Sequence, residues 1–343
     1  MRPALALLML LLTVACARAV DPNVTELTYA TQYAPSHPFS RADIAWMRFV
    51  EQRSGGRLRI RPIWSGTLLS SDMSMEELRH GVADIGLITP IYMRGGSHLI
   101  RIQSGFYSGV PEIENQVALY RCIASANPQI GHELDGLVVL AVQGGALPGI
   151  ITRDRPIRSL ADLRGMRIRA PTELLSVLRD LGADPVSMPM GEVYQAMTKR
   201  IIDGVVAPPD TFRALHFAEV GRYYSTLSVP RGAYPARAMG TRRWNSLTPE
   251  QRRVLEESIP VWEAALANEN RAALDRGLAE ARARNVTFIS LPPGEQARFD
   301  ALYLHDAELN AASMSRFGID GLAAFRTARN GIRSDGSIAC RGA

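Results

Sequence analysis

The residue types that most often carry catalysis or bind metals are present in this 343-residue sequence, but they are not arranged for either. Its six histidines are scattered, and no two have the spacing that places a pair of imidazoles on one helical face for zinc. No serine lies in a Gly-x-Ser-x-Gly turn, and no glycine-rich loop ends in Gly-Lys-Ser or Gly-Lys-Thr. The sequence therefore predicts no catalytic residue, no metal site and no cofactor, and we expect a protein that is not an enzyme.

A glycine-rich segment at residues 144–149, GGALPG, lacks the pattern of a dinucleotide-binding loop. Glycine has no Cβ, so it allows another group to approach the backbone closely. We expect this segment to pass close to a ligand or to form a hinge.

The N-terminus has the layout of a secretory signal peptide at residues 1–19. Arg2 supplies a positive charge, residues 4–14 are mostly apolar, and residues 17–19 read Ala-Arg-Ala, a small-x-small cleavage site. The apolar stretch is shorter than a membrane-spanning helix requires. We predict a soluble, exported protein that is located in the periplasm. An uncleaved anchor and a lipid anchor on Cys16 are the alternatives.

Two cysteines, Cys122 and Cys340, remain after removal of the signal peptide. In an oxidising compartment they could form a disulfide that ties the C-terminal tail to the body of the protein. The alternative is a pair of free thiols. Neither cysteine has a histidine at metal-binding or catalytic spacing.

The composition is that of a globular protein, with 46% hydrophobic and 21% charged residues and a formal charge of +5. Lys199 is the only lysine, and the arginines alternate with Asp and Glu along most of the chain. Because this pattern forms no basic stripe, we expect no nucleic-acid partner. Residues 20–343 are long enough for two domains.

Hydrophobic periodicity predicts strands that alternate with helices, in two successive series. The first series comprises strands at 26–30, 58–62 and 84–88 and helices at 40–53 and 74–81. The second comprises strands at 137–142, 166–170, 186–188 and 205–206 and helices at 173–181 and 192–200. Such alternation is typical of α/β domains with mainly parallel sheets.

The strongest helix signal begins at Thr248, where Pro249 and Gln251 complete a start motif with a capping box. Apolar residues recur at helical spacing up to residue 284, and Pro260 is expected to kink or restart the helix. A helix of this length could brace two lobes against each other.

Four segments of the second series carry a specific pattern: IRSLADLRGMRIRAP at 157–171, LGADPVSMP at 181–189, EVYQAM at 192–197 and IDGVV at 202–206. Together they closely resemble the substrate-binding subunits of tripartite ATP-independent periplasmic (TRAP) transporters, of the DctP type. Four N-terminal and central segments resemble the same family: residues 54–58, 66–69, 81–85 and 244–247.

The resemblance implies a two-lobed α/β periplasmic binding protein (class II-like), with mixed or parallel sheets flanked by helices, a long bracing helix and a ligand cleft between the lobes. Such proteins capture a small organic carboxylate by closure of the cleft and deliver it to a permease with one small and one large membrane subunit. A ligand sensor of the same fold that signals to a receptor, or a secreted enzyme, is the alternative function.

The expected division of the chain follows from the two series and the resemblance. Its parts are a signal peptide at 1–19, lobe I at 20–146 and 236–275, lobe II at 147–235 and 276–325, and a C-terminal tail at 326–343.

Arg169 is the principal candidate for ligand binding. It ends a predicted parallel strand, and α/β sheets place ligands in the crevice at this end of their strands. A guanidinium can donate two parallel hydrogen bonds to a carboxylate. In the family the arginine of this motif holds the ligand carboxylate, and Arg169 matches it. We expect Arg167, two residues earlier on the same face of the strand, to be an ordinary surface residue.

Three positions depart from the family pattern. Gly149 occupies the place of a second arginine, Ala207 that of an asparagine and Met190 that of a stacking aromatic side chain. These changes imply a ligand that differs from the sugar acids bound by some relatives and has a fairly apolar body. The remaining candidate ligand-binding residues, besides Met190, are Thr172, Tyr33, Gln32, Thr89 and Tyr234.

Overall fold

The structure, a computed structural model, describes residues 23–93 and 95–340. The predicted signal peptide at residues 1–19, and with it Cys16, lies outside the described residues. Within the two described ranges, no helix is both long enough and apolar enough to span a bilayer.

The first sheet has five strands in the order β2-β1-β3-β10-β4. Strand β1 pairs in parallel with β2 and β3, whereas β10 is antiparallel to both of its neighbours. The strands are β1 (Thr25–Ala30), β2 (Leu58–Ile63), β3 (Ile85–Leu87), β4 (Leu137–Gln143) and β10 (Tyr234–Gly240).

The second sheet has six strands in the order β11-β9-β5-β8-β6-β7. Strand β6 is parallel to β7 and β8, and β5 is antiparallel to β8 and β9. The strands are β5 (Gly149–Thr152), β6 (Arg167–Arg169), β7 (Asp184–Val186), β8 (Gly204–Ala207), β9 (Tyr223–Ser225) and β11 (Thr287–Ile289).

The predicted strand at 186–188 is wrong in position, because β7 covers Asp184–Val186 and pairs with the three residues of β6. Beyond Val186 the chain leaves the sheet, and the Met188 carbonyl accepts a hydrogen bond from Arg169 Nε at 3.0 Å. The Arg169 side chain, from the neighbouring strand β6, thus donates to a backbone carbonyl. If β7 were longer, this carbonyl would accept a backbone hydrogen bond within the sheet.

Helices cover both faces of each sheet, so each sheet lies between two hydrophobic cores. The α-helices are α2 (Pro38–Arg53), α3 (Ser74–Arg79), α4 (Leu99–Ile102), α5 (Ile113–Ala126), α6 (Pro128–Glu133), α7 (Leu175–Asp180), α8 (Val193–Thr198), α9 (Thr211–Ala214), α10 (Phe217–Val220), α11 (Thr241–Asn245), α12 (Pro249–Ala283), α13 (Pro293–Ser313) and α14 (Gly321–Gly331). The 3-10 helices are η1 (Pro90–Tyr92), η2 (Gln103–Tyr107), η3 (Leu160–Leu163), η4 (Thr172–Leu174), η5 (Met190–Glu192) and η6 (Met314–Phe317).

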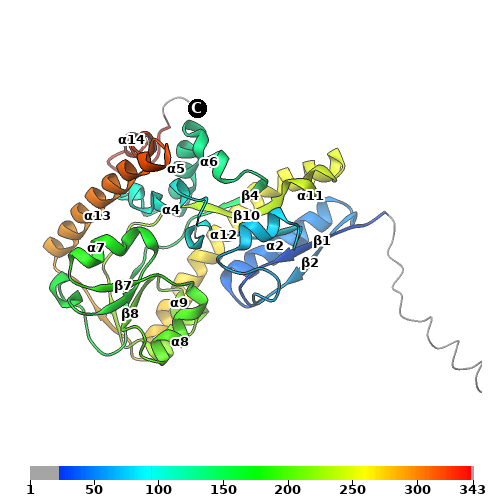
Figure 1. Ribbon diagram of the computed structural model, residues 1–343. Helices are drawn as coiled ribbons and strands as arrows, with labels where there is room; N and C mark the ends of the chain where they lie inside the picture. The colour runs from blue at the N-terminus through cyan, green and yellow to red at the C-terminus, as the bar shows by residue number, and fades with distance from the viewer. Residues whose placement is uncertain (1–22, 94, 341–343) are drawn as a thin grey trace, which may run out of the picture.

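The long helix α12 braces the two lobes. It begins with the predicted capping box between Thr248 and Gln251, and its N-terminal part is buried against α2, where Trp262 stacks on Trp46. Near its C-terminal end, Ala281 belongs to a core of the second sheet. In Figure 1, α12 (yellow) passes between the blue elements of the first lobe and the green elements of the second.

The predicted restart of this helix at Pro260 is wrong, because α12 continues through the proline without interruption. Proline removes one backbone hydrogen bond and strains the preceding turn. The buried side chains on both sides of it, Leu255 and Trp262, hold the helix in place by tertiary packing, which overrides the local preference.

The C-terminal region contributes to both lobes. Phe299 and Tyr303 of α13 pack in a core of the second sheet, whereas Phe325 of α14 packs in a core of the first sheet, close to α5. A disulfide joins Cys122 of α5 to Cys340, with their Cα atoms 5.6 Å apart. It links the last described residue to the first lobe.

Two segments cross between the sheets and complete a two-lobed α/β fold. Residues 144–148 lead from β4 to β5, and residues 226–233 lead back from β9 to β10. Together with α12 they connect the lobes, so the space between the lobes has these crossing segments on one side.

Candidate functional site

A cavity of about 130 Å³, which we call the inner cavity, lies between the two lobes at the crossing segments. The first lobe contributes Tyr33, His37, Phe39, Ile91, Tyr92, Ser104 and Tyr234 to its wall. The crossing segments contribute Pro148, Val229, Pro230, Arg231 and Gly232, and the second lobe Arg169, Pro171, Glu173, Met190, Val206, Pro208, Thr211 and Leu215. Most of these side chains are apolar or aromatic, and a few polar groups lie among them.

Arg169 is the most buried basic group of the inner cavity. It is 2% exposed at the C-terminal end of β6, where Nε donates to the Met188 carbonyl at 3.0 Å and Nη2 donates to the Tyr92 hydroxyl at 2.9 Å. In the described part of the chain, its guanidinium has no ion-pair partner, and both of its hydrogen-bond acceptors are neutral. A buried cation in this state is expected to attract an anion.

The hydrogen bond from Arg169 to Tyr92 connects the lobes. Arg169 belongs to β6 of the second sheet, and Tyr92 ends η1, which follows β3 of the first. The guanidinium carbon also lies 5.8 Å from the centroid of the Tyr92 ring. A carboxylate bound by Arg169 would therefore lie within reach of a hydroxyl donor from the opposite lobe.

Two further tyrosines supply neutral hydroxyl groups. Burial raises the pKa of Tyr33 and of Tyr234, so both stay protonated at neutral pH and can donate hydrogen bonds. The Tyr33 ring stacks on His37 with centroids 3.9 Å apart. Burial lowers the pKa of His37 to about 3, and its Nδ1 accepts a hydrogen bond from Phe39 N, so the ring is neutral and fixed.

Arg231 places a second guanidinium at the inner cavity. A Cβ added at Gly145 would lie 2.6 Å from the guanidinium carbon of Arg231, so a larger residue there would displace the end of this side chain. Gly145 is itself held by Gln116, which bonds both its amide and its carbonyl. The glycine-rich segment thus provides the predicted close approach, but to a protein side chain.

Two acidic groups lie near these arginines. Burial raises the pKa of Asp210 to about 6, although the charge of Arg231 partly opposes this shift. Burial also raises the pKa of Glu173, which lines the inner cavity and is 6% exposed; Ser104, Arg169 and Arg101 act in the opposite direction. The cavity therefore combines two guanidiniums with one buried carboxyl group on its wall.

The structure brings four of the predicted ligand-binding residues together at the inner cavity: Arg169, Tyr33, Met190 and Tyr234. Gln32 and Thr89 lie in an adjoining space of about 420 Å³, which we call the outer groove and which Tyr33, Tyr92 and Met190 also line.

Within the outer groove, the first lobe engages the Gln32 amide nitrogen and the Thr89 hydroxyl, whereas Gln32 Oε1 is buried without a hydrogen-bond partner among the described residues. Gln32 Nε2 donates to the Ser70 carbonyl at 2.8 Å, and the Thr89 hydroxyl donates to the Ser71 carbonyl. Thr172 lines neither space: it is exposed, and its hydroxyl lies 3.5 Å from that of Ser187.

The functional candidates that the sequence did not reveal are Tyr92, Arg231, Glu173 and Ser104. Each lies in a short 3-10 turn or in a crossing segment, where no periodic pattern indicates the direction of a side chain. The sequence feature that could have indicated Arg231 is Gly145, because a glycine in a tight space implies a bulky group opposite it. No group of three or more His, Cys, Asp and Glu residues suited to a metal ion occurs in residues 23–93 and 95–340.

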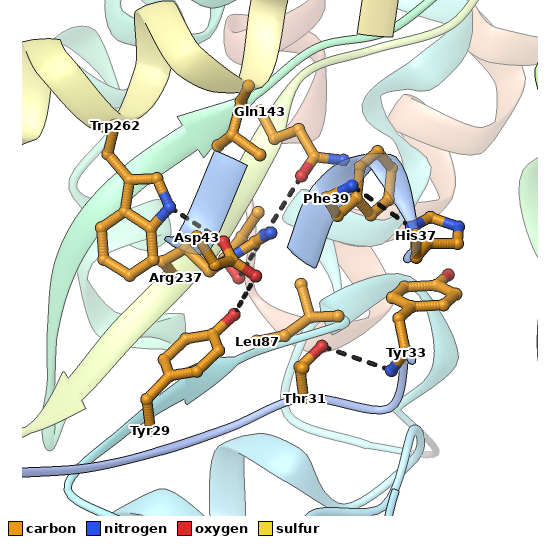
Figure 2. Close-up of polar contacts among 12 residues, drawn as sticks. Tyr29, Thr31, Tyr33, His37, Phe39, Asp43, Leu87, Gln143, Arg237 and Trp262 are labelled. Atoms are coloured by element: carbon orange, nitrogen blue, oxygen red, sulfur yellow. Dashed lines mark hydrogen bonds and ion pairs between the residues drawn. The ribbon is translucent and has the colours of Figure 1, made fainter. Parts of the chain in front are cut away.

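Behind the inner cavity lies a buried polar cluster, which comprises Asp43, Arg237, Tyr29, Trp262 and Gln143 (Figure 2). The Asp43 carboxylate accepts hydrogen bonds from Tyr29, from Trp262 Nε1 and from Arg237 Nε, the last two at 2.9 Å. Arg237 Nη1 donates to Gln143, whose amide donates in turn to the Tyr234 hydroxyl at 3.4 Å.

Comparison with known proteins identifies the family. Residues 29–305 match the model of the bacterial extracellular solute-binding proteins, family 7, which is the DctP family. The chain belongs to this family. The match covers the second sheet, the first sheet except residues 25–28 of β1, and every residue that lines the inner cavity, and it confirms the resemblance drawn from the sequence. Members of the DctP family bind solutes and are not enzymes.

Curated relatives of this DctP-family chain include binding proteins with different named solutes. A 2,3-diketo-L-gulonate-binding periplasmic protein of Escherichia coli is 24% identical over 69% of this chain and 74% of its own length. A C4-dicarboxylate-binding protein of Bacillus subtilis is 25% identical over 61% of this chain and 60% of its own.

Solved structures share the two-lobed fold. A TRAP solute-binding protein of Rhodoferax ferrireducens, in complex with copurified benzoate, superimposes with a TM-score of 0.81 at 24% identity and covers 90% of this chain and 97% of its own. A marine metagenome protein specific for aromatic acids, in complex with 3-hydroxybenzoate, gives 0.80 at 23% identity, with the same coverage of the two chains.

Proposed function

We propose that this DctP-family protein captures a small organic carboxylate in the inner cavity by closure of its lobes. In this proposal it works in the periplasm and delivers the acid to a TRAP permease with a small and a large membrane subunit. The supporting observation is Arg169, a buried guanidinium with only neutral partners in the described chain, which reaches Tyr92 across the cleft. A carboxylate on Arg169 and Tyr92 would contact both lobes and so favour the closed form.

The wall of the inner cavity favours an acid with a compact, apolar body. Its volume of about 130 Å³ leaves little room for a hydrated sugar chain, and apolar side chains such as Ile91, Met190 and Leu215 surround the polar groups. Structural relatives were crystallised with benzoate and with mandelate, among other acids. We therefore propose an aromatic or similarly compact monocarboxylate, held by Arg169 and assisted by Arg231.

A titration series tests this proposal. Benzoate, mandelate, succinate and glucuronate are each added to the purified protein, and the melting temperature and the heat of binding are measured. An acid at one hundred times its Kd adds about 2.7 kcal/mol to the free energy of unfolding. This corresponds to a rise in melting temperature of roughly 4 °C for a protein of this size.

The variant Arg169→Met tests the residue that holds the acid. It should weaken binding of the preferred acid by about 2–5 kcal/mol, which is the cost of removing one partner from a buried charge pair. Arg167→Met is the matched control: Arg167 lies two residues away on the same strand, exposed and paired with Asp184 at 2.7 Å. Equal affinities of the two variants would contradict the assignment to Arg169. Neighbouring genes for a small and a large membrane subunit would support the permease as partner.

A further inference from the structure

Glu173 presents a feature that carboxylate capture by Arg169 does not explain. It lies on the wall of the inner cavity in η4, and it is 6% exposed. Its Oε2 is fully buried, and among the described residues it has no hydrogen-bond partner. A buried oxygen without a donor is costly, and proteins rarely retain one without a reason.

The position of Glu173 makes it available to a ligand. It follows Arg169 by four residues, at the end of β6 that faces the cleft, and it packs beside Ser104 and Tyr303. A molecule whose carboxylate is held by Arg169 would therefore have Glu173 on the wall of the same small cavity. A turn of the Glu173 side chain toward the cavity would bring its unpartnered carboxyl oxygen within reach of a hydrogen-bond donor on that molecule.

The charges around the cavity restrict the kind of donor. An ammonium group would suit Glu173, but the guanidiniums of Arg169 and Arg231 line the same cavity and would repel it. A hydroxyl group donates a hydrogen bond without adding a positive charge. A second carboxylate next to Glu173 would meet a like charge.

We propose that the ligand is a hydroxy-substituted carboxylate, whose carboxylate binds Arg169 and whose hydroxyl donates to Glu173. This inference rests on the proposed function and deepens it by naming the substrate class. Glu173 is then a residue that determines specificity, because a cavity built to bond a hydroxyl disfavours an analogue that leaves its polar group unpaired.

Matched pairs of acids test the inference. The pairs are benzoate with 3-hydroxybenzoate, phenylacetate with mandelate and butyrate with 3-hydroxybutyrate, and the Kd of each acid is measured by calorimetry. In at least one pair the hydroxylated acid should bind the wild-type protein tenfold or more tightly than its partner. Equal affinities within every pair would overturn the inference and leave the proposed function intact. Failure of all six acids to bind would contradict both.

Two variants assign the preference to Glu173. In Glu173→Leu the hydroxylated and unsubstituted acids should bind within about threefold of each other. Glu173→Gln keeps a neutral acceptor, so it should retain about half of the preference on a logarithmic scale, because bonds to charged acceptors are roughly twice as strong. Glu173→Gln also provides the test if Glu173→Leu does not fold. A full preference in either variant would overturn the inference.

Discussion

Two buried arginines, Arg237 and Arg169, have opposite surroundings. Arg237 is fully buried in the polar cluster, where Asp43 neutralises its charge at 2.9 Å and Gln143 accepts a further hydrogen bond. Arg169 is 2% exposed and bonds only the Met188 carbonyl and the Tyr92 hydroxyl. The first arginine has an ion-pair partner within the protein. The second has none in the described chain, although the buried Glu173 carboxyl lies close enough to feel its charge.

The presence or absence of an ion-pair partner distinguishes a buried arginine that stabilises the fold from one that can bind an anionic ligand. Burial by itself lowers the pKa of Arg237, but Asp43 and Tyr29 more than offset this and keep the group charged. Asp43 also bonds Trp262 of α12, so the cluster ties the bracing helix to the first sheet (Figure 2). Arg169 connects the two lobes through its hydrogen bond to the neutral Tyr92 hydroxyl, and its charge remains available to a carboxylate.

The largest expected effect follows from breaking the polar cluster. In Asp43→Asn, Arg237 remains buried without its counter-ion, which should lower the free energy of unfolding by about 3–5 kcal/mol. The melting temperature should fall by roughly 4–7 °C, as measured by circular dichroism. Below that temperature the variant should still bind the preferred acid within a few-fold of the wild-type Kd. By contrast, Arg169→Met should lose affinity without a lower melting temperature.

The control for this prediction removes the whole ion pair. The double variant Asp43→Leu with Arg237→Met should be more stable than Asp43→Asn, because no buried charge remains unpaired. If Asp43→Asn instead abolished binding in the folded protein, the polar cluster would belong to the binding site and the contrast between the arginines would be wrong.

Local sequence signals predicted much of this arrangement. The capping box at Thr248 fixed the start of α12, alternation indicated β1 and β2, and the strand that ends at Arg169 was recognised. These features depend on neighbours a few residues apart. The restart expected at Pro260 is absent because packing of distant residues decided the outcome.

The sequence could not predict the parts of the site that depend on distant segments. At the inner cavity Arg231 lies against Gly145, which is far away in the sequence, and no local pattern reveals this contact. Glu173 and Tyr92 lie in short 3-10 helices. The direction of a side chain there depends on tertiary packing, and no hydrophobic periodicity in the sequence indicates it. Thr172 was expected to face the ligand because it follows the arginine motif, but the turn directs it outward.

A pH effect of intermediate size is expected at His37, which lies between the two regions. Burial lowers the pKa of His37 to about 3, and the charges of Arg41 and Arg237 add to this shift. Below pH 6.5 the unfolded chain binds a proton that the folded protein excludes down to about pH 3. The free energy of unfolding therefore decreases as the pH falls from 6.5 to about 3, by at most about 1.4 kcal/mol for each pH unit.

The variant His37→Asn isolates this contribution, since asparagine can still accept the hydrogen bond from Phe39 N at the start of α2. Urea denaturation of both proteins from pH 7 to pH 4 should show that the wild type loses more stability than the variant. Asp210, with a pKa of about 6, acts in the opposite direction between pH 3.8 and 6, so only the difference between the two proteins is informative. Parallel curves would show that His37 is not kept neutral by its surroundings.

The smallest expected effect is at Thr172, next to Glu173 in the same turn. Thr172→Ala removes an exposed hydroxyl whose nearest polar neighbour is Ser187, so stability should change by no more than about 0.5 kcal/mol. The Kd for the preferred acid should stay within about twofold of wild type, whereas Glu173→Leu should alter the choice between acids. A tenfold loss of affinity in Thr172→Ala would mean that η4 rotates when the ligand binds. In that case the unpaired state of Arg169 and Glu173 would describe the protein before capture, and the contacts of the complex would include the outer face of this turn.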